Sequence, residues 1–210
     1  MGTPTARHDK TTRFASWQSI FAATYQDKLA GRFPTMKAAL NLFLQHDGTT
    51  IVETGTLRWV ESLEHGWEGD GNATYIFGEV LQEFGGHLWT CDADPVAIAE
   101  SREGTKRFAD HITYVNQDSV AFLDSFDHPI DLLYLDSMDC PREGDASAAQ
   151  AHNLRELQAA LPKLSRNGVT LIDDNGYPNG GKALKSKQHL AEQGWLCLYD
   201  AQQTLWMRRC

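Results

Sequence analysis

Short apolar segments alternate with helical segments through most of the chain, and this alternation limits the possible folds more than any other feature. Strands are expected at residues 50–55, 87–92, 112–117, 131–136 and 168–173. Helices are expected at about 73–84, 95–110, 119–126, 146–163 and 181–193. Short apolar strands separated by helices are typical of a parallel sheet that is covered on both faces.

The two ends of the chain depart from this alternation. Residues 1–13 are polar and are expected to form a flexible N-terminus, and two helices, at about 15–29 and 36–46, precede the first strand. Near the C-terminus, two apolar segments flank a polar turn that leaves no room for a helix, which predicts an antiparallel hairpin. A chain of this length favours one domain, at residues 14–210, with residues 14–48 as a helical cap.

The composition excludes several classes of partner. The 210 residues are 41% hydrophobic and carry a formal net charge of −9, without a cluster of Lys and Arg, which argues against nucleic acid. No apolar run is long enough to span a membrane, and the N-terminal residues lack the apolar stretch of a signal peptide. The four cysteines show no metal-binding spacing. We therefore expect a cytoplasmic protein with no membrane or nucleic-acid partner, and leave open a homo-oligomer.

Acidic residues follow the expected parallel strands at the point where each strand ends. They are Glu53, Asp92, Asp118, Asp136 and Asp174. Open α/β sheets bind ligands beyond the carboxyl ends of their strands, so these side chains should lie around one crevice. The phosphate-binding pattern G-x-G-x-x-G and the P-loop lysine are both absent. The arrangement suits a cationic, hydroxyl-rich nucleoside better than a phosphate.

The residues at the first three strand ends have separate possible roles. Gly55 allows the backbone to approach a ligand, and Glu53 can meet an ammonium group, although both can also belong to a simple turn. Asp92 can accept hydrogen bonds from both hydroxyls of a ribose. Asp118 and Ser119 can contact an adenine, but either can equally cap the helix that follows.

Over roughly residues 36–210 the chain resembles class I S-adenosylmethionine-dependent methyltransferases. The resemblance lies in the motifs at these strand ends, in their order along the chain, and in the hairpin that follows them. The motifs are Glu53-Thr-Gly-Thr, Cys91-Asp-Ala-Asp-Pro, Gln117-Asp-Ser and Asp131-Leu-Leu-Tyr-Leu-Asp. The resemblance implies an α/β fold that is Rossmann-like and doubly wound, with a mostly parallel seven-stranded sheet. The pattern is most similar to small-molecule O-methyltransferases of the catechol, caffeoyl-coenzyme A and macrolide-sugar type.

The same resemblance implies which residues bind the cofactor. Glu53, Gly55 and Thr56 would hold the methionine end of S-adenosylmethionine, and Asp92 would hold the ribose. Asp118 and Ser119 would contact the adenine, while Asp136 would border the cofactor. An insertion at residues 57–72 displaces the second glycine of the motif to Gly71.

A metal site is expected next to the cofactor. Asp136, Asp174 and Asn175 offer the hard oxygen ligands that Mg²⁺ prefers, and they match the metal-binding positions of the catechol-type enzymes. The alternative is that Asp174-Asn175-Gly176 is only a turn. Those enzymes also place a lysine shortly after the metal-binding Asp, and this chain does not. Asp136, Asp139, His152 and Lys182 are the candidate catalytic groups, and a metal could make a separate base unnecessary.

The insertion at residues 57–72 is far longer than the usual connection between a strand and its helix. It contains Trp59, Trp67 and several glycines, which together predict a lid that closes over cofactor and acceptor.

The sequence thus favours a metal-assisted O-methyltransferase that acts on a small hydroxylated molecule. A non-catalytic nucleoside-binding or assembly module is the alternative, and a nicotinamide-dependent oxidoreductase is a weaker one because its glycine-rich turn is missing.

Overall fold

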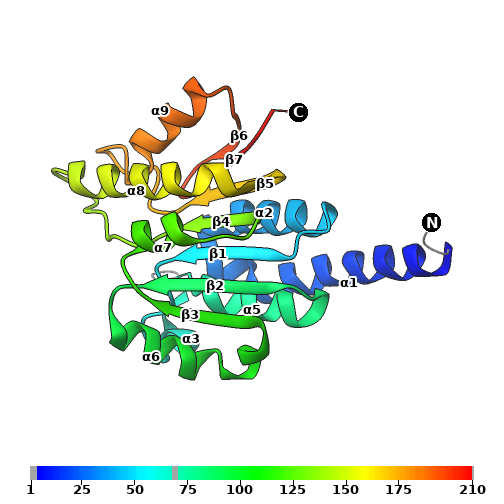
Figure 1. Cartoon of the computed structure of the whole chain (residues 1–210). Coiled ribbons are helices and arrows are strands. Elements are labelled where there is room, and N and C mark those ends of the chain that lie inside the picture. The colour runs from blue at the N-terminus through cyan, green and yellow to red at the C-terminus, as the bar shows by residue number, and fades with distance from the viewer. Residues whose placement is uncertain (1–3, 68–70, 210) are drawn as a thin grey trace.

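A computed structural model describes residues 4–67 and 71–209, and its centre is the seven-stranded sheet shown in Figure 1. The strands are β1 (Thr50–Thr54), β2 (His87–Asp92), β3 (Ile112–Asn116), β4 (Ile130–Leu135), β5 (Leu164–Ile172), β6 (Leu196–Asp200) and β7 (Thr204–Met207). Their order is β3-β2-β1-β4-β5-β7-β6, and the pairs among β1 to β5 are parallel. Strand β7 is antiparallel to both β5 and β6, so the predicted sheet and C-terminal hairpin are confirmed.

The helices follow the predicted alternation with small shifts at their ends. They include α1 (Pro4–Leu29), α2 (Phe33–Gln45), α3 (Ser62–His65), α5 (Ala73–Phe84), α6 (Pro95–Gly104), α7 (Ser119–Ser125), α8 (Ser147–Ala160) and α9 (Leu184–Glu192). Helix α6 is shorter than predicted: it ends at Gly104, a poor helix former, and a 3-10 helix at Lys106–His111 continues the chain. None of the described helices is both long and apolar enough to cross a membrane.

The first helix is longer than predicted and extends into the segment at residues 1–13. Residues 1–3 lie outside the described residues, but the chain is helical from Pro4, and α1 extends beyond the sheet on the right of Figure 1. Neither proline nor glycine occurs between Pro4 and Gly31, so nothing in the backbone chemistry interrupts the helix. The first helix thus begins before its predicted start at about residue 15, and the flexibility of residues 1–13 stays a prediction.

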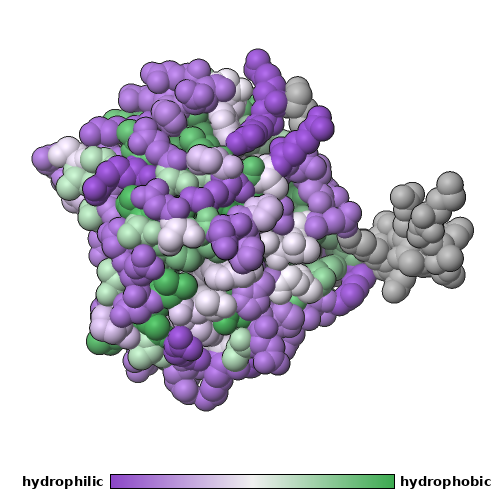
Figure 2. Space-filling model, in the orientation of Figure 1, coloured by the Kyte–Doolittle hydropathy of each residue, from purple (hydrophilic) through white to green (hydrophobic). Residues whose placement is uncertain are grey.

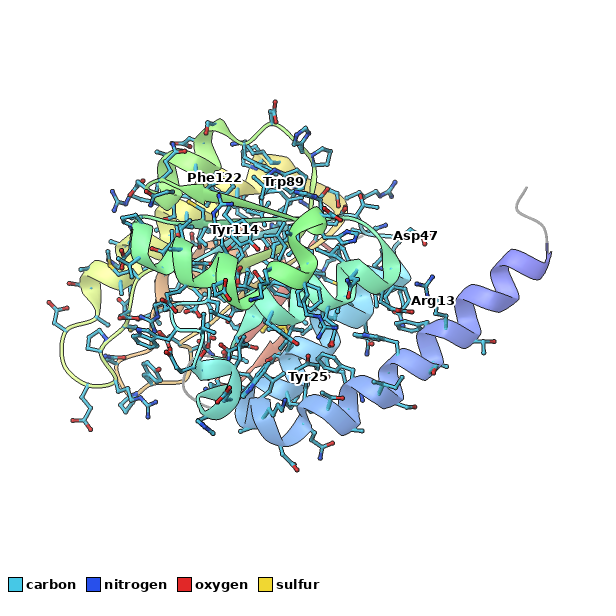
Figure 3. All side chains as sticks on the ribbon, turned by 90° about the horizontal axis from the view of Figure 1, so that it is seen from below. Arg13, Tyr25, Asp47, Trp89, Tyr114 and Phe122 are labelled. Atoms are coloured by element: carbon cyan, nitrogen blue, oxygen red, sulfur yellow. The ribbon has the colours of Figure 1, made fainter. Side chains whose placement is uncertain are left out.

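Two apolar layers cover the two faces of the sheet. One layer joins α1, α2 and α5 to the sheet and includes Phe21, Phe77 and Leu132. The other joins α7, α8 and α9 to the opposite face and includes Phe122 and Leu133. Figure 3 shows Tyr25 of α1 on one side and Phe122 on the other. Adjacent residues of β4 enter opposite layers because strand side chains alternate. Figure 2 shows a mostly hydrophilic surface around this core.

Backbone hydrogen bonds continue past the last residues of neighbouring strands and bring their ends level. Asp136 N–H donates to the Thr54 carbonyl (2.8 Å), and Asp173 N–H donates to the Leu135 carbonyl (3.2 Å). Gly55 follows β1 with φ +78°, and a Cβ there would lie 2.3 Å from the carbonyl oxygen of Asp136. A side chain at position 55 would therefore push apart the two strand ends that begin the functional site.

A buried ion pair attaches the N-terminal helices to the carboxyl end of β5. Arg32, in the 3-10 turn between α1 and α2, donates through Nε to the Asp173 carboxylate (2.8 and 3.1 Å). The Tyr134 hydroxyl donates to the same carboxylate at 2.6 Å. Burial would raise the pKa of Asp173, but Arg32 and Tyr134 hold the pKa of that carboxyl below its usual range.

Arg32→Ala should destabilise the fold by about 3–5 kcal/mol, because it leaves the Asp173 carboxylate buried without its cation. Arg13→Ala is the matched control, since the Arg13–Glu83 pair is half exposed and should contribute at most about 1 kcal/mol. Urea unfolding at neutral pH measures both changes. Equal stability of the two variants would show that the buried pair does not hold the helical cap in place.

Candidate active site

A cavity opens at the carboxyl edge of β1, β2 and β4, where the sequence placed the ligand crevice. It is lined by Arg32, Glu53, Gly55, Thr56, Leu57, Arg58, Asn72, Ala73, Thr74, Asp92, Tyr134, Asp136, Ser137, Asp139, Cys140, Asp174 and Tyr177. The strand ends of the first, second and fourth strands are thus brought together, as predicted. The third strand end and Asn175 do not contribute to this lining.

Glu53, at the end of β1, is buried beside the cavity. The hydroxyls of Thr74 and Thr90 donate to its Oε2 at 2.8 and 2.7 Å. Burial raises the pKa of Glu53 to about 8, although the two hydroxyl donors oppose the shift. The carboxyl group is therefore largely neutral at pH 7 in the protein without ligand, and a cationic group that binds beside it would favour its ionised form.

Asp92, at the end of β2, lines the cavity, and its carboxylate can accept further hydrogen bonds from a ligand there. Its Oδ1 accepts from the Asp94 amide at 2.9 Å, while Oδ2 has only a long contact, 3.4 Å, with the Thr56 amide. The Thr56 hydroxyl bonds instead to Ser101 (2.7 Å). Gly71 has φ +66° and does not line the cavity, whereas its neighbour Asn72 does.

Asp118 and Ser119 lie at the start of α7, away from the cavity lining. Asp118 accepts a hydrogen bond from the Ala121 amide at 3.0 Å and thereby caps the helix. The buried Ser119 hydroxyl pairs with Nε2 of His152 on α8 at 2.9 Å. His152 therefore joins α7 to α8. Its Nε2 is 3.6 Å from Oε1 of Glu156, which accepts a hydrogen bond from Ser137, the neighbour of Asp136, and its catalytic role stays a prediction. The adenine assignment of Asp118 and Ser119 stays a prediction.

Lys182 lies between the ends of β4 and β5, and only 2% of its side chain is exposed. Its Nζ donates to Oδ1 of Asp136 at 2.7 Å and is 3.1 Å from Oδ2 of Asp174. Burial alone would lower the pKa of Lys182, but the two carboxylates raise the pKa above its ordinary value. The side chain is therefore an ammonium ion, which cannot act as the general base for which it was a candidate.

The residues predicted to bind Mg²⁺ do not form a shared oxygen shell around an open position. The Lys182 ammonium already bridges Asp136 and Asp174, and the Tyr177 hydroxyl donates to the other oxygen of Asp174 at 2.6 Å. Asn175 directs its Nδ2 to Asp200 and to the Ala201 carbonyl, although its buried Oδ1 lacks a hydrogen-bond partner among the described residues.

Charge decides whether a divalent cation fits beside this ammonium. A divalent ion ~4 Å from an ammonium ion is repelled by about 8 kcal/mol at an effective dielectric constant of ~20. The two carboxylates that would attract a divalent ion already hold the ammonium, so the ion would have to displace it. The residues present therefore do not fit Mg²⁺ while Lys182 keeps this position.

The insertion at residues 57–72 is more ordered than a simple loop, although residues 68–70 lie outside the described residues. Trp67 is buried, with its ring centroid 5.4 Å from that of Tyr25, and its Nε1 donates to the Leu63 carbonyl. Trp59 is half exposed. Neither tryptophan lines the cavity, to which the insertion contributes Leu57, Arg58 and Asn72. Movement of this segment as a lid stays a prediction.

Asp139, the remaining catalytic candidate, lies at the mouth of the cavity. Its carboxylate is largely exposed and accepts a hydrogen bond from Nη1 of Arg58 at 2.9 Å. Its exposed position in an ion pair with Arg58 favours a role at the entrance rather than in the chemistry.

Three further residues at the site were not predicted from the sequence. Arg32 approaches from the N-terminal cap, Tyr134 reaches Asp173 from within β4, and Tyr177 bonds to Asp174. The one available signal was Asp173 itself, since a carboxylate directly after a buried strand needs a partner. Nothing in the sequence identified which cation would supply it.

The fold and the acidic strand ends define a class I S-adenosylmethionine-dependent methyltransferase. Residues 63–175, more than half of the chain, match a family described as "Methyltransferase domain". The chain belongs to this methyltransferase family. A comparison with curated protein sequences gives no match.

Several solved methyltransferase structures share the fold. The S-adenosylhomocysteine-bound PaMTH1 of Podospora anserina is 14% identical with a TM-score of 0.56, over 100% of this chain and 98% of that one. The O-methyltransferase NovP is 16% identical with a TM-score of 0.60, over 86% and 80%. A ribosomal-protein methylase of Lactobacillus delbrueckii subsp. bulgaricus is 14% identical with a TM-score of 0.52, over 84% and 79%. At such identities the likeness concerns the fold alone.

The raised pKa of Glu53 makes the stability of the protein depend on pH. Between the ordinary pKa of 4.5 and about 8 the folded state keeps a proton that the unfolded state releases. Wild-type stability should therefore fall relative to Glu53→Gln as pH rises from 5 to 8, by a few kcal/mol at about 1.4 kcal/mol per pKa unit. Above this range the difference should be constant. Urea unfolding of both proteins across the range measures it, and a difference that does not change with pH would contradict the neutral, buried Glu53.

Proposed function

We propose that this protein transfers the methyl group of S-adenosylmethionine to a hydroxyl group of a small molecule. The observation that carries the proposal is the centre formed by Asp136, Lys182 and Asp174, where a carboxylate at the cavity is paired with a fixed ammonium ion. The cavity also contains Glu53 and Asp92, the two strand-end carboxylates to which we assign the methionine end and the ribose of the cofactor.

The centre supplies what hydroxyl methylation needs. As the acceptor oxygen attacks, the new C–O bond forms, the C–S bond of the sulfonium breaks, and S-adenosylhomocysteine leaves. The hydroxyl proton passes to Asp136, which the proposal makes the general base. The Lys182 ammonium is buried behind Asp136 and does not line the cavity, so it stabilises the negative charge that develops on the acceptor oxygen through its charge rather than by contact.

An amine acceptor gains less from the same centre. Its nitrogen becomes positively charged as the methyl group is transferred, and a neighbouring ammonium ion opposes that change. This contrast is the reason to prefer O-methylation, and the fold shared with NovP is compatible with it. We do not carry the predicted Mg²⁺ into the proposal, because the ammonium of Lys182 lies between the carboxylates that would bind it.

The reaction is tested with cofactor labelled with carbon-13 in the transferred methyl group and a panel of phenols, catechols and sugars. The expected product is an O-methyl group, which carbon-13 NMR distinguishes from an N-methyl group. Transfer only to amines would contradict the proposal. Binding of S-adenosylhomocysteine without transfer to any acceptor would favour the non-catalytic nucleoside-binding alternative.

Asp136→Asn should lower the rate of methyl transfer by about 10²–10⁴-fold, because the acceptor proton loses its base. Affinity for S-adenosylhomocysteine should change little, as titration calorimetry can measure. Asp131→Asn is the control: Asp131 lies at the other end of β4 and accepts hydrogen bonds from the Thr49 and Thr50 amides. A full rate in Asp136→Asn would remove Asp136 as the base.

Asp92→Ala should weaken the binding of S-adenosylhomocysteine about tenfold or more, since a charge-assisted hydrogen bond to the ribose contributes ~1.5–3 kcal/mol. Asp94→Ala is the matched control, because Asp94 caps α6 through the Val96 amide. The control should lose about 1 kcal/mol of stability and keep its affinity. If a folded Asp92→Ala protein binds as tightly as the wild type, the ribose assignment is wrong.

A further inference from the structure

We infer that the ammonium group of Lys182 is a built-in replacement for a divalent cation, and that removal of this side chain uncovers a divalent-cation site formed by Asp136 and Asp174. The inference concerns which cation these carboxylates hold. It goes beyond the proposed function and does not depend on the acceptor or on the atom that is methylated.

The placement of the ammonium carries the argument. Nζ lies 2.7 Å from Oδ1 of Asp136 and 3.1 Å from Oδ2 of Asp174, so one cation serves carboxylates from two neighbouring strand ends. The lysine side chain is buried, while both carboxylates are partly exposed towards the cavity. The Lys182 ammonium thus reaches the two carboxylates from the protein interior, whereas a metal ion would reach them from the solvent through the cavity.

Backbone contacts position Lys182 beside Asp136 and Asp174 without help from the lysine side chain. Gly181 has φ +62°, and a Cβ there would lie 2.1 Å from the carbonyl oxygen of Asp174. That same carbonyl accepts a hydrogen bond from the Lys182 amide at 3.0 Å. The turn between the two residues is therefore closed by backbone contacts that Lys182→Ala retains.

Removal of the side chain leaves groups that suit a hard cation. Two carboxylates without a counter-ion repel each other, and a divalent ion neutralises both. Asn175 does not line the cavity, so Asp136 and Asp174 are the protein ligands of the uncovered site. Water can complete the shell, because Lys182→Ala vacates the volume of the side chain beyond Cβ.

A purely structural ion pair is the competing explanation, and it makes a different prediction. If Lys182 only stabilises the turn, its loss should weaken the fold without creating affinity for a metal. Lys182→Met separates the two effects, since methionine removes the charge but keeps most of the volume filled with an apolar chain.

The test is titration of the full chain with Mn²⁺, with free Mn²⁺ followed by its electron paramagnetic resonance signal. The wild type and Lys182→Met should bind no Mn²⁺ at this site. Lys182→Ala should bind one ion at least about tenfold more tightly than the wild type, because the repelling ammonium has gone and, unlike in Lys182→Met, the vacated volume is open to the ion and its water. The double variant Lys182→Ala with Asp174→Asn should lose that affinity again.

The following results would overturn the inference. It fails if wild-type protein binds one Mn²⁺ that Asp136→Asn abolishes, or if folded Lys182→Ala binds no more tightly than the wild type. If Lys182→Ala unfolds in metal-free buffer, Mn²⁺ must restore its near-ultraviolet circular dichroism, and the absence of such rescue contradicts the inference.

Discussion

Buried carboxylates at one edge of the sheet have to be neutralised, and the rest of the site depends on how this is done. Glu53 is neutralised by keeping its proton, since burial raises its pKa to about 8. Asp173 is paired with Arg32, and Asp136 with Lys182. If any of these carboxylates were charged and unpaired, the fold would lose several kcal/mol of stability. The partner that each carboxylate requires therefore also fixes the position of the chain segment that carries the partner.

The two cations come from opposite ends of the chain and have different consequences. Arg32 comes from the turn between α1 and α2 and fixes the helical cap across the carboxyl end of β5. Lys182 follows a glycine turn after β5 and lies beside the cavity. A fixed ammonium offers hydrogen bonds and charge but no coordination positions. It therefore does not require an acceptor with two adjacent oxygens, as chelation to a metal ion would.

The sequence was sufficient where local patterns decide the structure. The apolar strands, the hairpin and the acidic residue at each strand end followed from periodicity and from where parallel strands terminate. The partners of those acidic residues could not be predicted in the same way. Lys182 reaches Asp136 only because Gly181 adopts a positive φ, and Arg32 meets Asp173 across more than half of the chain.

Two sequence-based assignments depended on packing that no local pattern encodes. Trp59 or Trp67 was expected to lie against a substrate, and Trp67 packs on Tyr25 of α1 because the insertion lies against the N-terminal helix. His152 was a candidate base, but it bonds to Ser119, which belongs to a different helix. A tryptophan in a long loop and a histidine on a helix carry no signal of which neighbour they will meet.

The most direct measurement is a crystal structure of the wild-type protein with S-adenosylhomocysteine, grown in Mn²⁺ and recorded at a wavelength where manganese scatters anomalously. The account predicts the Lys182 side chain between Asp136 and Asp174, the cofactor ribose at Asp92, and no anomalous peak beside these carboxylates. A manganese peak within about 2.0–2.6 Å of both Asp136 and Asp174, with Lys182 displaced, would contradict it.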